Sequence, residues 1–244
     1  MAIRCVLMDI EGTIVPIAFV REVLFPYAMQ RMSTFLDERR EDPAVRQWAA
    51  LCQDASAEQS GIRPTYDELP GILQRWMEAD YKQTGLKGLQ GMIWEEGYKG
   101  GAFAPALYED VLSALISWRA QGIQLALYSS GSEQAQRLLM TYTTKGDLTG
   151  FFTKFFDTAV GPKTSRESYR RIATTLDLAP DTILFLSDIE AELDAAAAAS
   201  FRTTQILRSG TQAGTHHALA SDFLNLPLFG ISDASRHPAI KINI

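Results

Sequence analysis

The stretch CVLMDIEGT, residues 5–13, decides the fold, because an apolar strand ends there in two acidic residues. The apolar run Ile3–Met8, interrupted only by Arg4, is typical of a strand buried in a parallel sheet. Asp9 and Glu11 follow, and residues two apart at a strand end project to one side. Such a pair either caps a helix and contacts solvent, or converges at the carboxyl edge of a sheet, where open α/β sheets bind ligands.

The second half of the chain alternates between strands and helices. Four further apolar runs are expected to be strands: Ile123–Tyr128, Phe151–Phe156, Thr182–Leu186 and Thr203–Leu207. Three stretches between and after them are expected to be helices: Glu133–Met140, Thr164–Leu176 and Glu190–Ser200. This order predicts the α/β class, with a doubly wound, mostly parallel, Rossmann-like sheet of five strands.

Residues 19–100 interrupt this alternation. They lack strand-like runs, and their apolar residues recur at helical spacing. We therefore expect an α/β catalytic core of residues 1–18 and 101–244, with an all-helical cap, residues 19–100, inserted after the first strand. The cap is expected above the carboxyl edge of the sheet, and Lys241–Ile244 is expected to be a frayed tail.

The composition narrows the functional class. The 244 residues carry a formal net charge of −6, which argues against a nucleic-acid-binding protein. The two cysteines, Cys5 and Cys52, fit free thiols in a reducing compartment better than a disulfide. The sequence has no secretory signal pattern and no apolar stretch of transmembrane length. We expect a soluble, cytoplasmic protein that binds neither nucleic acid nor membrane, and a monomer by default.

Polar residues of complementary kinds follow the other predicted strands. Ser129 and Ser130 come directly after the second strand, Lys163 after the third, and Asp188 after the fourth. Hydroxyl groups beside a helix N-terminus form an anion site, and an ammonium neutralises phosphate charge. Carboxylates and carbonyl oxygens are the ligands that Mg²⁺ prefers. Singly, such residues are N-caps or surface lysines, but their joint order predicts a phosphate site with a metal ion.

This order of residues resembles the haloacid dehalogenase-like phosphohydrolases, whose four motifs match Asp9–Thr13, Ser129, Lys163 and Asp188. Phosphatases of that superfamily usually have Asp two residues after the nucleophile, whereas this chain has Glu11. That difference resembles the enolase-phosphatase (acireductone synthase) branch. Further stretches resemble the same branch: Pro16–Val20, Val23–Ala28, Leu86–Trp94, Gly97–Tyr98, Tyr128–Ser132 and Glu167–Tyr169.

The resemblance implies a methionine-salvage enzyme that enolises 2,3-diketo-5-methylthiopentyl-1-phosphate and dephosphorylates the enol to the acireductone. Asp9 is the expected nucleophile, and Glu11 the expected acid and base. Three residues are expected to hold Mg²⁺: Asp9, Asp188 and, through its carbonyl, Glu11. The phosphate oxygens are expected at Ser129 and Lys163, with Ser130 close to the substrate.

Other residues carry weaker expectations. Four cap residues are candidates for contacting the methylthio-diketone end of the substrate, although packing within the cap explains the two aromatic ones better: Arg21, Lys87, Trp94 and Tyr98. His216 and His217 are expected in a loop before a last helix, as a solvated helix start rather than catalytic groups. Arg166 and Glu167 either orient Lys163 or form an exposed helix face.

Three alternatives stay open. The first is a phosphatase of the same superfamily that acts on another small phosphorylated metabolite, a reaction that would need no enolisation. A dehalogenase fits less well, because that chemistry needs neither Mg²⁺ nor the Glu11 acid. A non-catalytic sensor of a phosphorylated metabolite would not need Asp9, Lys163 and Asp188 together.

Overall fold

The computed structural model describes residues 2–226 and 228, and the expected tail Lys241–Ile244 lies outside this range. Contacts group the chain into two compact units. We call residues 1–14, 108–130 and 150–244 the α/β unit, and residues 15–107 and 131–149 the helical unit. The domain boundaries expected from the sequence stay a prediction.

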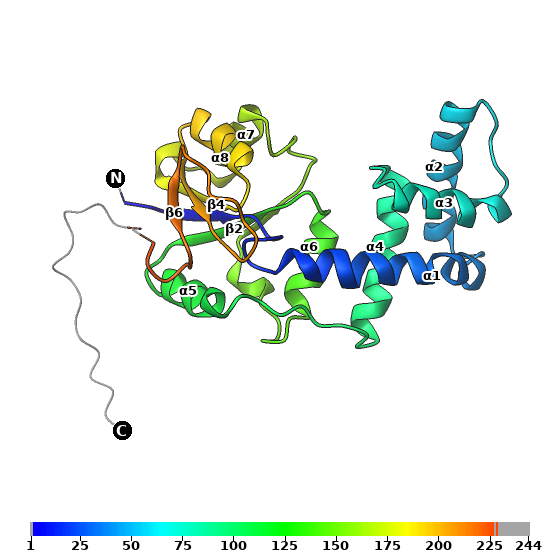
Figure 1. Cartoon of the computed structure of the whole chain (residues 1–244), viewed down its shortest axis with the longest axis horizontal. Coiled ribbons are helices and arrows are strands. Elements are labelled where there is room, and N and C mark those ends of the chain that lie inside the picture. The colour runs from blue at the N-terminus through cyan, green and yellow to red at the C-terminus, as the bar shows by residue number, and fades with distance from the viewer. Residues whose placement is uncertain (1, 227, 229–244) are drawn as a thin grey trace, which may run out of the picture. The chain divides into compact units, whose positions relative to one another are not determined.

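The α/β unit is built around one parallel sheet with the strand order β3-β2-β1-β4-β5-β6 (Figure 1). The strands are β1 Cys5–Met8, β2 Gln124–Tyr128, β3 Lys154–Phe156, β4 Ile183–Ser187, β5 Arg202–Ile206 and β6 Ala218–Ala220. Every pairing between neighbouring strands is parallel. The α/β prediction is confirmed, although the sheet has a sixth strand that the sequence analysis missed.

Helices cover both faces of this sheet, which makes it doubly wound. The helices of the unit are α5 Glu109–Ala120, α7 Arg166–Leu176 and α8 Glu190–Ala198, with short 3₁₀ turns at Thr149–Phe151 and Pro180–Thr182. Figure 1 shows α7 and α8 on one side of the sheet and α5 on the other. Apolar side chains of β1, β2 and β4 pack with α7 and α8 in one buried cluster, in which Tyr128, Tyr169 and Phe185 are fully buried. This core places the carboxyl ends of the central strands side by side.

Strand β1 lies in the middle of the sheet, between β2 and β4, and all four of its residues are buried. It pairs with β2 on one side and with β4 on the other, so that Met8 lies opposite both Leu127 and Leu186. The residues that follow these three strands therefore meet at one edge of the sheet. This is the edge at which the sequence analysis placed the ligand site.

The helical unit contains no strand among its described residues, and its helices alternate with tight turns. They are a π-helical turn Phe19–Leu24, α1 Phe25–Glu38, α2 Pro43–Ser60, a 3₁₀ turn Tyr66–Glu68, α3 Leu69–Glu78, α4 Thr84–Lys99 and α6 Glu133–Thr141. Helix α2 begins where the Asp42 side chain accepts a hydrogen bond from the Ala44 N–H, and ends at Gly61, whose φ of 76° suits glycine.

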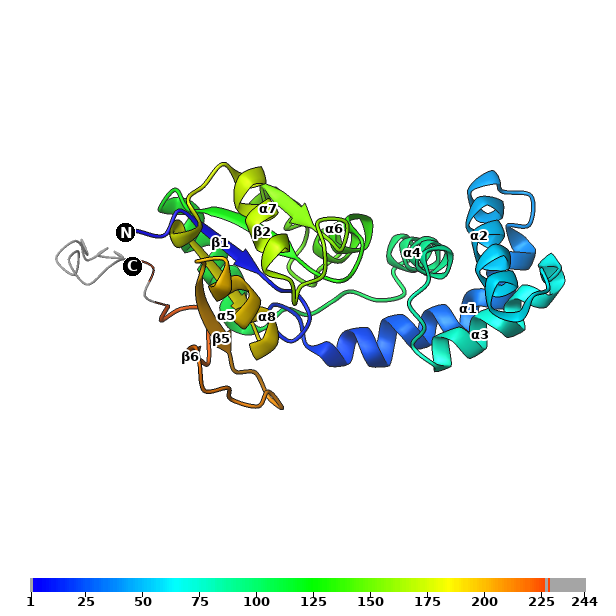
Figure 2. The same ribbon diagram turned by 90° about the horizontal axis from the view of Figure 1, so that it is seen from above.

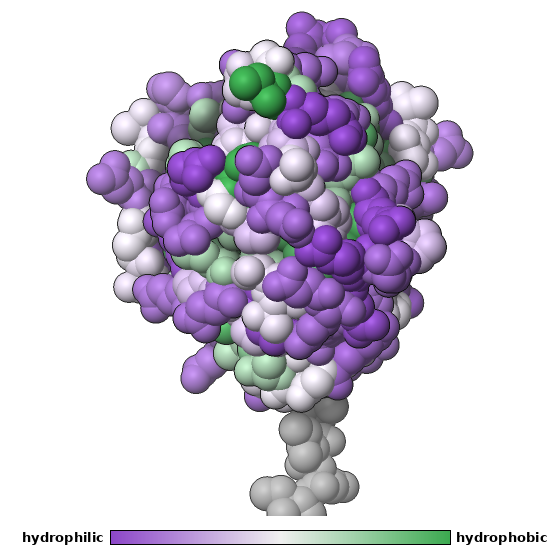
Figure 3. Space-filling view, turned by 90° about the vertical axis from the view of Figure 1, so that its right-hand side faces the viewer, coloured by the Kyte–Doolittle hydropathy of each residue, from purple (hydrophilic) through white to green (hydrophobic). Residues whose placement is uncertain are grey.

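The helical unit has an apolar core of its own. Figure 2 shows α2 and α3 beside α1, and apolar residues of α1 to α4 form a buried cluster that includes Phe35, Leu73 and Leu89. On the face of the molecule that Figure 3 shows, hydrophilic side chains predominate and apolar ones are scattered, as on ordinary protein surfaces. Within the described residues, no helix is both long and apolar enough to cross a membrane.

Candidate active site

The loop after β1 brings the motif residues of the first strand to the edge of the sheet. Asp9 is 4% exposed, and its N–H donates a hydrogen bond to the Leu186 carbonyl at 2.9 Å, which continues the pairing of β1 with β4. Gly12 has a φ of 77°, and a Cβ there would overlap the carboxylate of Asp188. The close approach of this loop to Asp188 therefore requires glycine at position 12.

Asp188 follows β4, and both its backbone N–H and its carbonyl form hydrogen bonds with side chains. Its N–H donates to the Thr13 hydroxyl at 3.1 Å, and its carbonyl accepts from the Gln205 side chain at 2.9 Å. Within the described part of the chain, the buried Oδ1 of Asp188 has no hydrogen-bond partner. Burial, and then the negative charge of Asp9, raises the pKa of Asp188 to about 6. These features fit a carboxylate that can bind a cation.

Lys163 is a buried cation that contacts Asp9. Its Nζ lies 2.6 Å from Asp9 Oδ1 and 2.7 Å from Glu192 Oε2, and its side chain is 8% exposed. Burial alone would lower the pKa of this ammonium, but the two carboxylates outweigh burial and raise the pKa. Lys163 therefore stays charged and holds one oxygen of Asp9 in place.

Glu192 is a site residue that the sequence analysis missed. It lies in the first turn of α8, where it accepts a hydrogen bond from the Ser187 hydroxyl at 2.9 Å. Burial, and then the negative charge of Asp9, raises the pKa of Glu192, although Lys163 acts in the opposite direction. In the sequence, an acidic residue early in a helix indicates only a favourable helix dipole. Because Asp188 precedes α8, the spacing of the two residues in the sequence does not mark Glu192 as a site residue.

The remaining predicted residues lie at the same edge of the sheet or in the motif loop. Ser129 follows β2, is 3% exposed, and donates its N–H to the Phe156 carbonyl at 3.1 Å. Ser130 is exposed, and Glu11 is half-buried in the loop after β1.

The described residues contain no group of three His, Cys, Asp or Glu side chains that could hold a metal ion. The expected metal site accordingly needs a main-chain ligand beside Asp9 and Asp188.

A second buried ion pair, between Arg208 and Asp110, contacts the loop after β1. The Arg208 guanidinium forms two hydrogen bonds with Asp110, at 2.8 and 2.9 Å, and also donates to the Thr13 carbonyl at 3.0 and 3.2 Å. It lies 4.1 Å from the centre of the Tyr108 ring. Because the Thr13 hydroxyl holds Asp188, Arg208 is linked through Thr13 to the loop that carries the candidate site.

The structure separates several weaker candidates from this cluster. His217 directly precedes β6, so the expected helix start is wrong; its ring nitrogens lie 2.8 Å from the Thr203 hydroxyl and 3.0 Å from Asp194. The three-residue strand is too short and too exposed to have given a strand signal. Arg166 and Glu167 are exposed.

The aromatic candidates of the helical unit are engaged in packing. The Trp94 indole donates to the Leu24 carbonyl at 2.8 Å, and the buried Tyr98 ring stacks on Tyr142 with centroids 5.5 Å apart. Lys87 and Arg21 are exposed. Contact of these four residues with a substrate stays a prediction.

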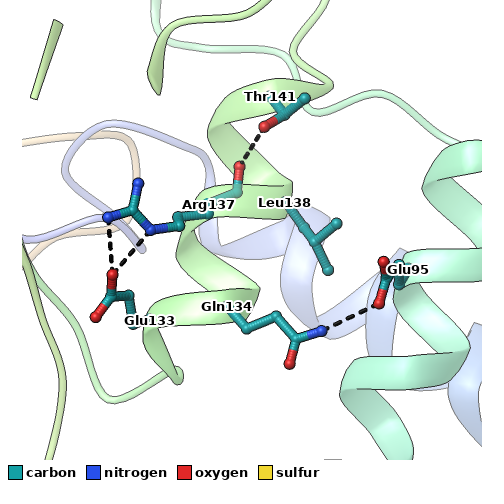
Figure 4. Close-up of a pocket in the computed structure, with 6 residues that line it drawn as sticks. All are labelled: Glu95, Glu133, Gln134, Arg137, Leu138 and Thr141. Atoms are coloured by element: carbon teal, nitrogen blue, oxygen red, sulfur yellow. Dashed lines mark hydrogen bonds and ion pairs between the residues drawn. The ribbon is translucent and has the colours of Figure 1, made fainter. Parts of the chain in front are cut away.

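A surface groove of about 340 Å³ lies between α4 and α6 in the helical unit. Figure 4 shows Gln134 of α6 directed toward Glu95 of α4, to which its amide donates at 3.0 Å. Arg137 and Glu133 pair one turn apart on α6, at 2.8 Å. The charges of this groove are thus engaged within the helical unit, and it lacks the buried, unbalanced carboxylates of the sheet edge.

Comparison with known proteins gives a consistent set of relatives. The family profile of haloacid dehalogenase-like hydrolases matches residues 3–200. The chain is 50% identical to an enolase-phosphatase E1 of Gluconacetobacter diazotrophicus over 90% of its length and 91% of that protein. It is 44% identical to an enolase-phosphatase E1 of Alcanivorax borkumensis, over 93% of this chain and 99% of that one.

Solved structures agree with the fold. The UTR4 protein of Saccharomyces cerevisiae is 30% identical and matches with a TM-score of 0.76 over 92% of this chain and all of that one. CbbY of Rhodobacter sphaeroides, solved in complex with phosphate, matches with a TM-score of 0.59 at 17% identity, over 91% and 96% of the two chains. At that identity the second match concerns the fold alone.

Proposed function

The chain belongs to the haloacid dehalogenase-like hydrolases and, within them, to the enolase-phosphatases, and from this membership we propose the reaction that its α/β unit performs. The substrate is 2,3-diketo-5-methylthiopentyl-1-phosphate, an intermediate of methionine salvage. The enzyme enolises the diketone and then hydrolyses the phosphate ester, which gives the acireductone and phosphate. The single observation that supports this chemistry at the sheet edge is the buried Asp9 carboxylate, held at one oxygen by Lys163.

In the phosphatase half, Asp9 is the nucleophile. Lys163 holds Oδ1, so Oδ2 is assigned the attack on phosphorus. The bond from Asp9 to phosphorus forms while the ester bond from phosphorus to the substrate oxygen breaks, and Glu11 gives its proton to that oxygen. Glu11 then takes a proton from water, whose oxygen bonds to phosphorus and releases phosphate and Asp9.

A divalent cation fits the site, and Mg²⁺ is the ion proposed. It would be held by the Asp9 carboxylate, the Glu11 carbonyl and Asp188 Oδ1, which has no hydrogen-bond partner in the described part of the chain. When bound, Mg²⁺ offsets the repulsion between the Asp9 carboxylate and the phosphoryl group. Ser129 and Lys163 would bind the phosphate oxygens, and Ser130 would contact the substrate close by.

Glu11 is also assigned a part in enolisation. Its side chain is one methylene longer than the Asp that most phosphatases of the superfamily carry, which extends its reach into the pocket. We expect Glu11→Asp to slow exchange of substrate hydrogen with solvent deuterium more than it slows phosphate release. Exchange that survives unchanged in Glu11→Asp would remove Glu11 from the enolisation step.

The experiment that tests the function is a coupled assay of the diketo phosphate with Mg²⁺. The absorbance of the enol and acireductone is followed together with phosphate release. Growth of both signals in stoichiometric amounts supports the enolase-phosphatase reaction. Phosphate released from simple esters without an enol signal would instead indicate another phosphatase of the superfamily.

Two further properties complete the proposal. We place the enzyme in the cytoplasm, because its proposed substrate is an intermediate of methionine salvage. We take it to be a monomer, since the cluster of Asp9, Lys163 and Glu192 is built from one chain. Light scattering of the purified protein, with the phosphatase assay at the same concentration, tests the second statement.

A further inference from the structure

The loop that carries Lys163 is held by hydroxyl groups. Three successive backbone carbonyls of this loop each accept a hydrogen bond from a buried side chain. The bonds are Tyr128 hydroxyl to Gly161 at 2.8 Å, Ser168 hydroxyl to Pro162 at 2.8 Å, and Tyr169 hydroxyl to Lys163 at 2.7 Å. We call Tyr128, Ser168 and Tyr169 the hydroxyl clamp.

The members of the hydroxyl clamp sit on rigid elements. Tyr128 is the last residue of β2 and directly precedes Ser129, and the other two residues lie in the first turn of α7. The Tyr169 ring packs edge-on against Tyr128, with centroids 5.6 Å apart, and also contacts the Phe185 ring of β4 at 5.2 Å. The sheet and the helix therefore both fix the path of the loop.

The loop is matched to these hydroxyls. Gly161 has a φ of 130°, a backbone conformation that L side chains rarely adopt, and a Cβ at this position would overlap the Ser168 hydroxyl. Burial raises the pKa of the Tyr128 and Tyr169 phenols, so both remain hydrogen-bond donors at neutral pH. This arrangement gives each of the three loop carbonyls a hydrogen-bond donor, and the bond to the Lys163 carbonyl is buried.

We propose that the hydroxyl clamp is a positioning device that determines where the Lys163 ammonium lies between Asp9 and Glu192. A lysine side chain has a flexible four-carbon stem, so its charged end is placed only as well as its backbone is fixed. Small displacements of a positioned group are costly to a reaction that depends on alignment. The inference rests on the proposed role of Lys163 in the phosphatase reaction, and it assigns a task to the Ser168-Tyr169 pair that the four motifs leave out.

Two substitutions remove one hydroxyl each and keep the ring: Tyr169→Phe and Tyr128→Phe. Tyr66→Phe is the matched control, because the Tyr66 hydroxyl donates to the Leu36 carbonyl at 3.0 Å within the helical unit. All three substitutions delete one hydrogen bond from a tyrosine to a backbone carbonyl. A general loss of stability is therefore common to the three variants, whereas a change at Lys163 is specific to the clamp.

The first readout is competitive acetylation of lysines, measured by mass spectrometry, with the exposed Lys154 as internal reference. The second is kcat/KM for p-nitrophenyl phosphate, together with inhibition by inorganic phosphate. In Tyr169→Phe and Tyr128→Phe we expect Lys163 to be acetylated about tenfold faster relative to Lys154, and kcat/KM to fall about tenfold, which corresponds to one lost hydrogen bond. Inhibition by phosphate weakens in parallel, and Tyr66→Phe changes none of these values.

Unchanged acetylation and kinetics in both clamp variants, with a melting temperature lowered as in Tyr66→Phe, would overturn the inference, because the hydroxyls would then stabilise the fold only. If Tyr169→Phe does not fold, Ser168→Ala and Tyr128→Phe decide the question by the same readouts. Acetylation of Lys163 does not depend on the identity of the substrate. A wild-type enzyme that hydrolyses no phosphomonoester would thus contradict the proposed function, while the acetylation ratios would still decide the role of the clamp.

Discussion

Two buried ion-pair groups in the α/β unit differ in charge balance. In the first, the side chains of Arg208 and Asp110 are 6% and 11% exposed, and one cation meets one anion through two hydrogen bonds. In the second, Lys163 is as deeply buried but lies between two carboxylates, Asp9 and Glu192. The first group pairs one guanidinium with one carboxylate, whereas the second places two carboxyl groups on one ammonium.

The difference separates a structural role from a chemical one. Burying charges costs free energy that only good pairing recovers, so a neutral, fully hydrogen-bonded pair is what a fold needs to join distant loops. A second buried carboxyl group on one ammonium, beside an oxygen of Asp188 that has no hydrogen-bond partner among the described residues, only raises the free energy of the metal-free protein. Such an arrangement is typical of sites where a ligand completes the charge balance.

The largest expected effect belongs to the unbalanced group. Asp9→Asn keeps the size of the side chain but removes the nucleophile, so we expect phosphate release to fall by about 10⁴-fold or more. The enol should then accumulate without phosphate in the coupled assay. A residual rate within about tenfold of the wild-type enzyme would show that Asp9 does not attack phosphorus.

Removing the cation of the balanced group should cost mainly stability. Arg208→Met leaves Asp110 buried without its partner, and we expect the free energy of unfolding to fall by about 3–5 kcal/mol in urea titrations. Asp110 also accepts from the Phe223 N–H at 2.8 Å, so one of its oxygens keeps a donor. A loss below about 1 kcal/mol would mean that this pair does not join the loops as described.

Two matched neutralisations sharpen the comparison further. Asp110→Asn breaks the balanced pair and should destabilise the metal-free protein, whereas Glu192→Gln relieves the excess charge and should leave its stability equal or higher. Glu192→Gln should still lower kcat about tenfold, because Lys163 loses one of its two charged partners. Equal destabilisation by both variants would contradict the division into a structural and a chemical group.

A further expected effect is a pH dependence of stability at Asp188. Its pKa is raised from 3.8 to about 6 in the folded protein, so between these values the unfolded chain has released a proton that the folded protein retains. The contribution of this group to stability therefore declines as pH rises from about 4 to 6 and stays low above. Melting temperatures of the metal-free protein should fall over this window in the wild type relative to Asp188→Asn.

Mg²⁺ supplies the control for that experiment. At neutral pH it should raise the melting temperature of the wild type and leave Asp188→Asn unchanged, because binding stabilises only the protein that has the ligand. Parallel pH profiles of the two proteins, or equal stabilisation of both by Mg²⁺, would show that Asp188 is neither the titrating group nor a metal ligand.

The sequence predicted those parts of the fold and of the site that follow from local pattern. The five predicted strands, and the cluster of Asp9, Lys163 and Asp188, depend on apolar runs that end in polar residues, which is a short-range signal. Strand β6 was missed because its three residues are partly exposed and do not alternate.

Glu192 and Arg208 were missed for a different reason. The partners of Arg208, Thr13 and Asp110, are 195 and 98 residues away in the chain, so no local pattern reports the contact. Glu192 lies in the first turn of a helix, where an acidic residue is expected in any case. Only the tertiary arrangement distinguishes a site residue from a helix-dipole residue there.

The most direct test of the central claim is to trap the phosphorylated enzyme. The wild type is mixed with substrate and Mg²⁺, quenched during turnover, and treated with borohydride, which reduces an acyl phosphate on aspartate to homoserine. The account predicts homoserine at position 9 and at no other acidic residue, with none in Asp9→Asn. Homoserine at Asp188, the one-carbon-longer 2-amino-5-hydroxypentanoic acid at Glu192, or full turnover with Asp9 unmodified would contradict the assignment of Asp9 as the nucleophile of this cluster.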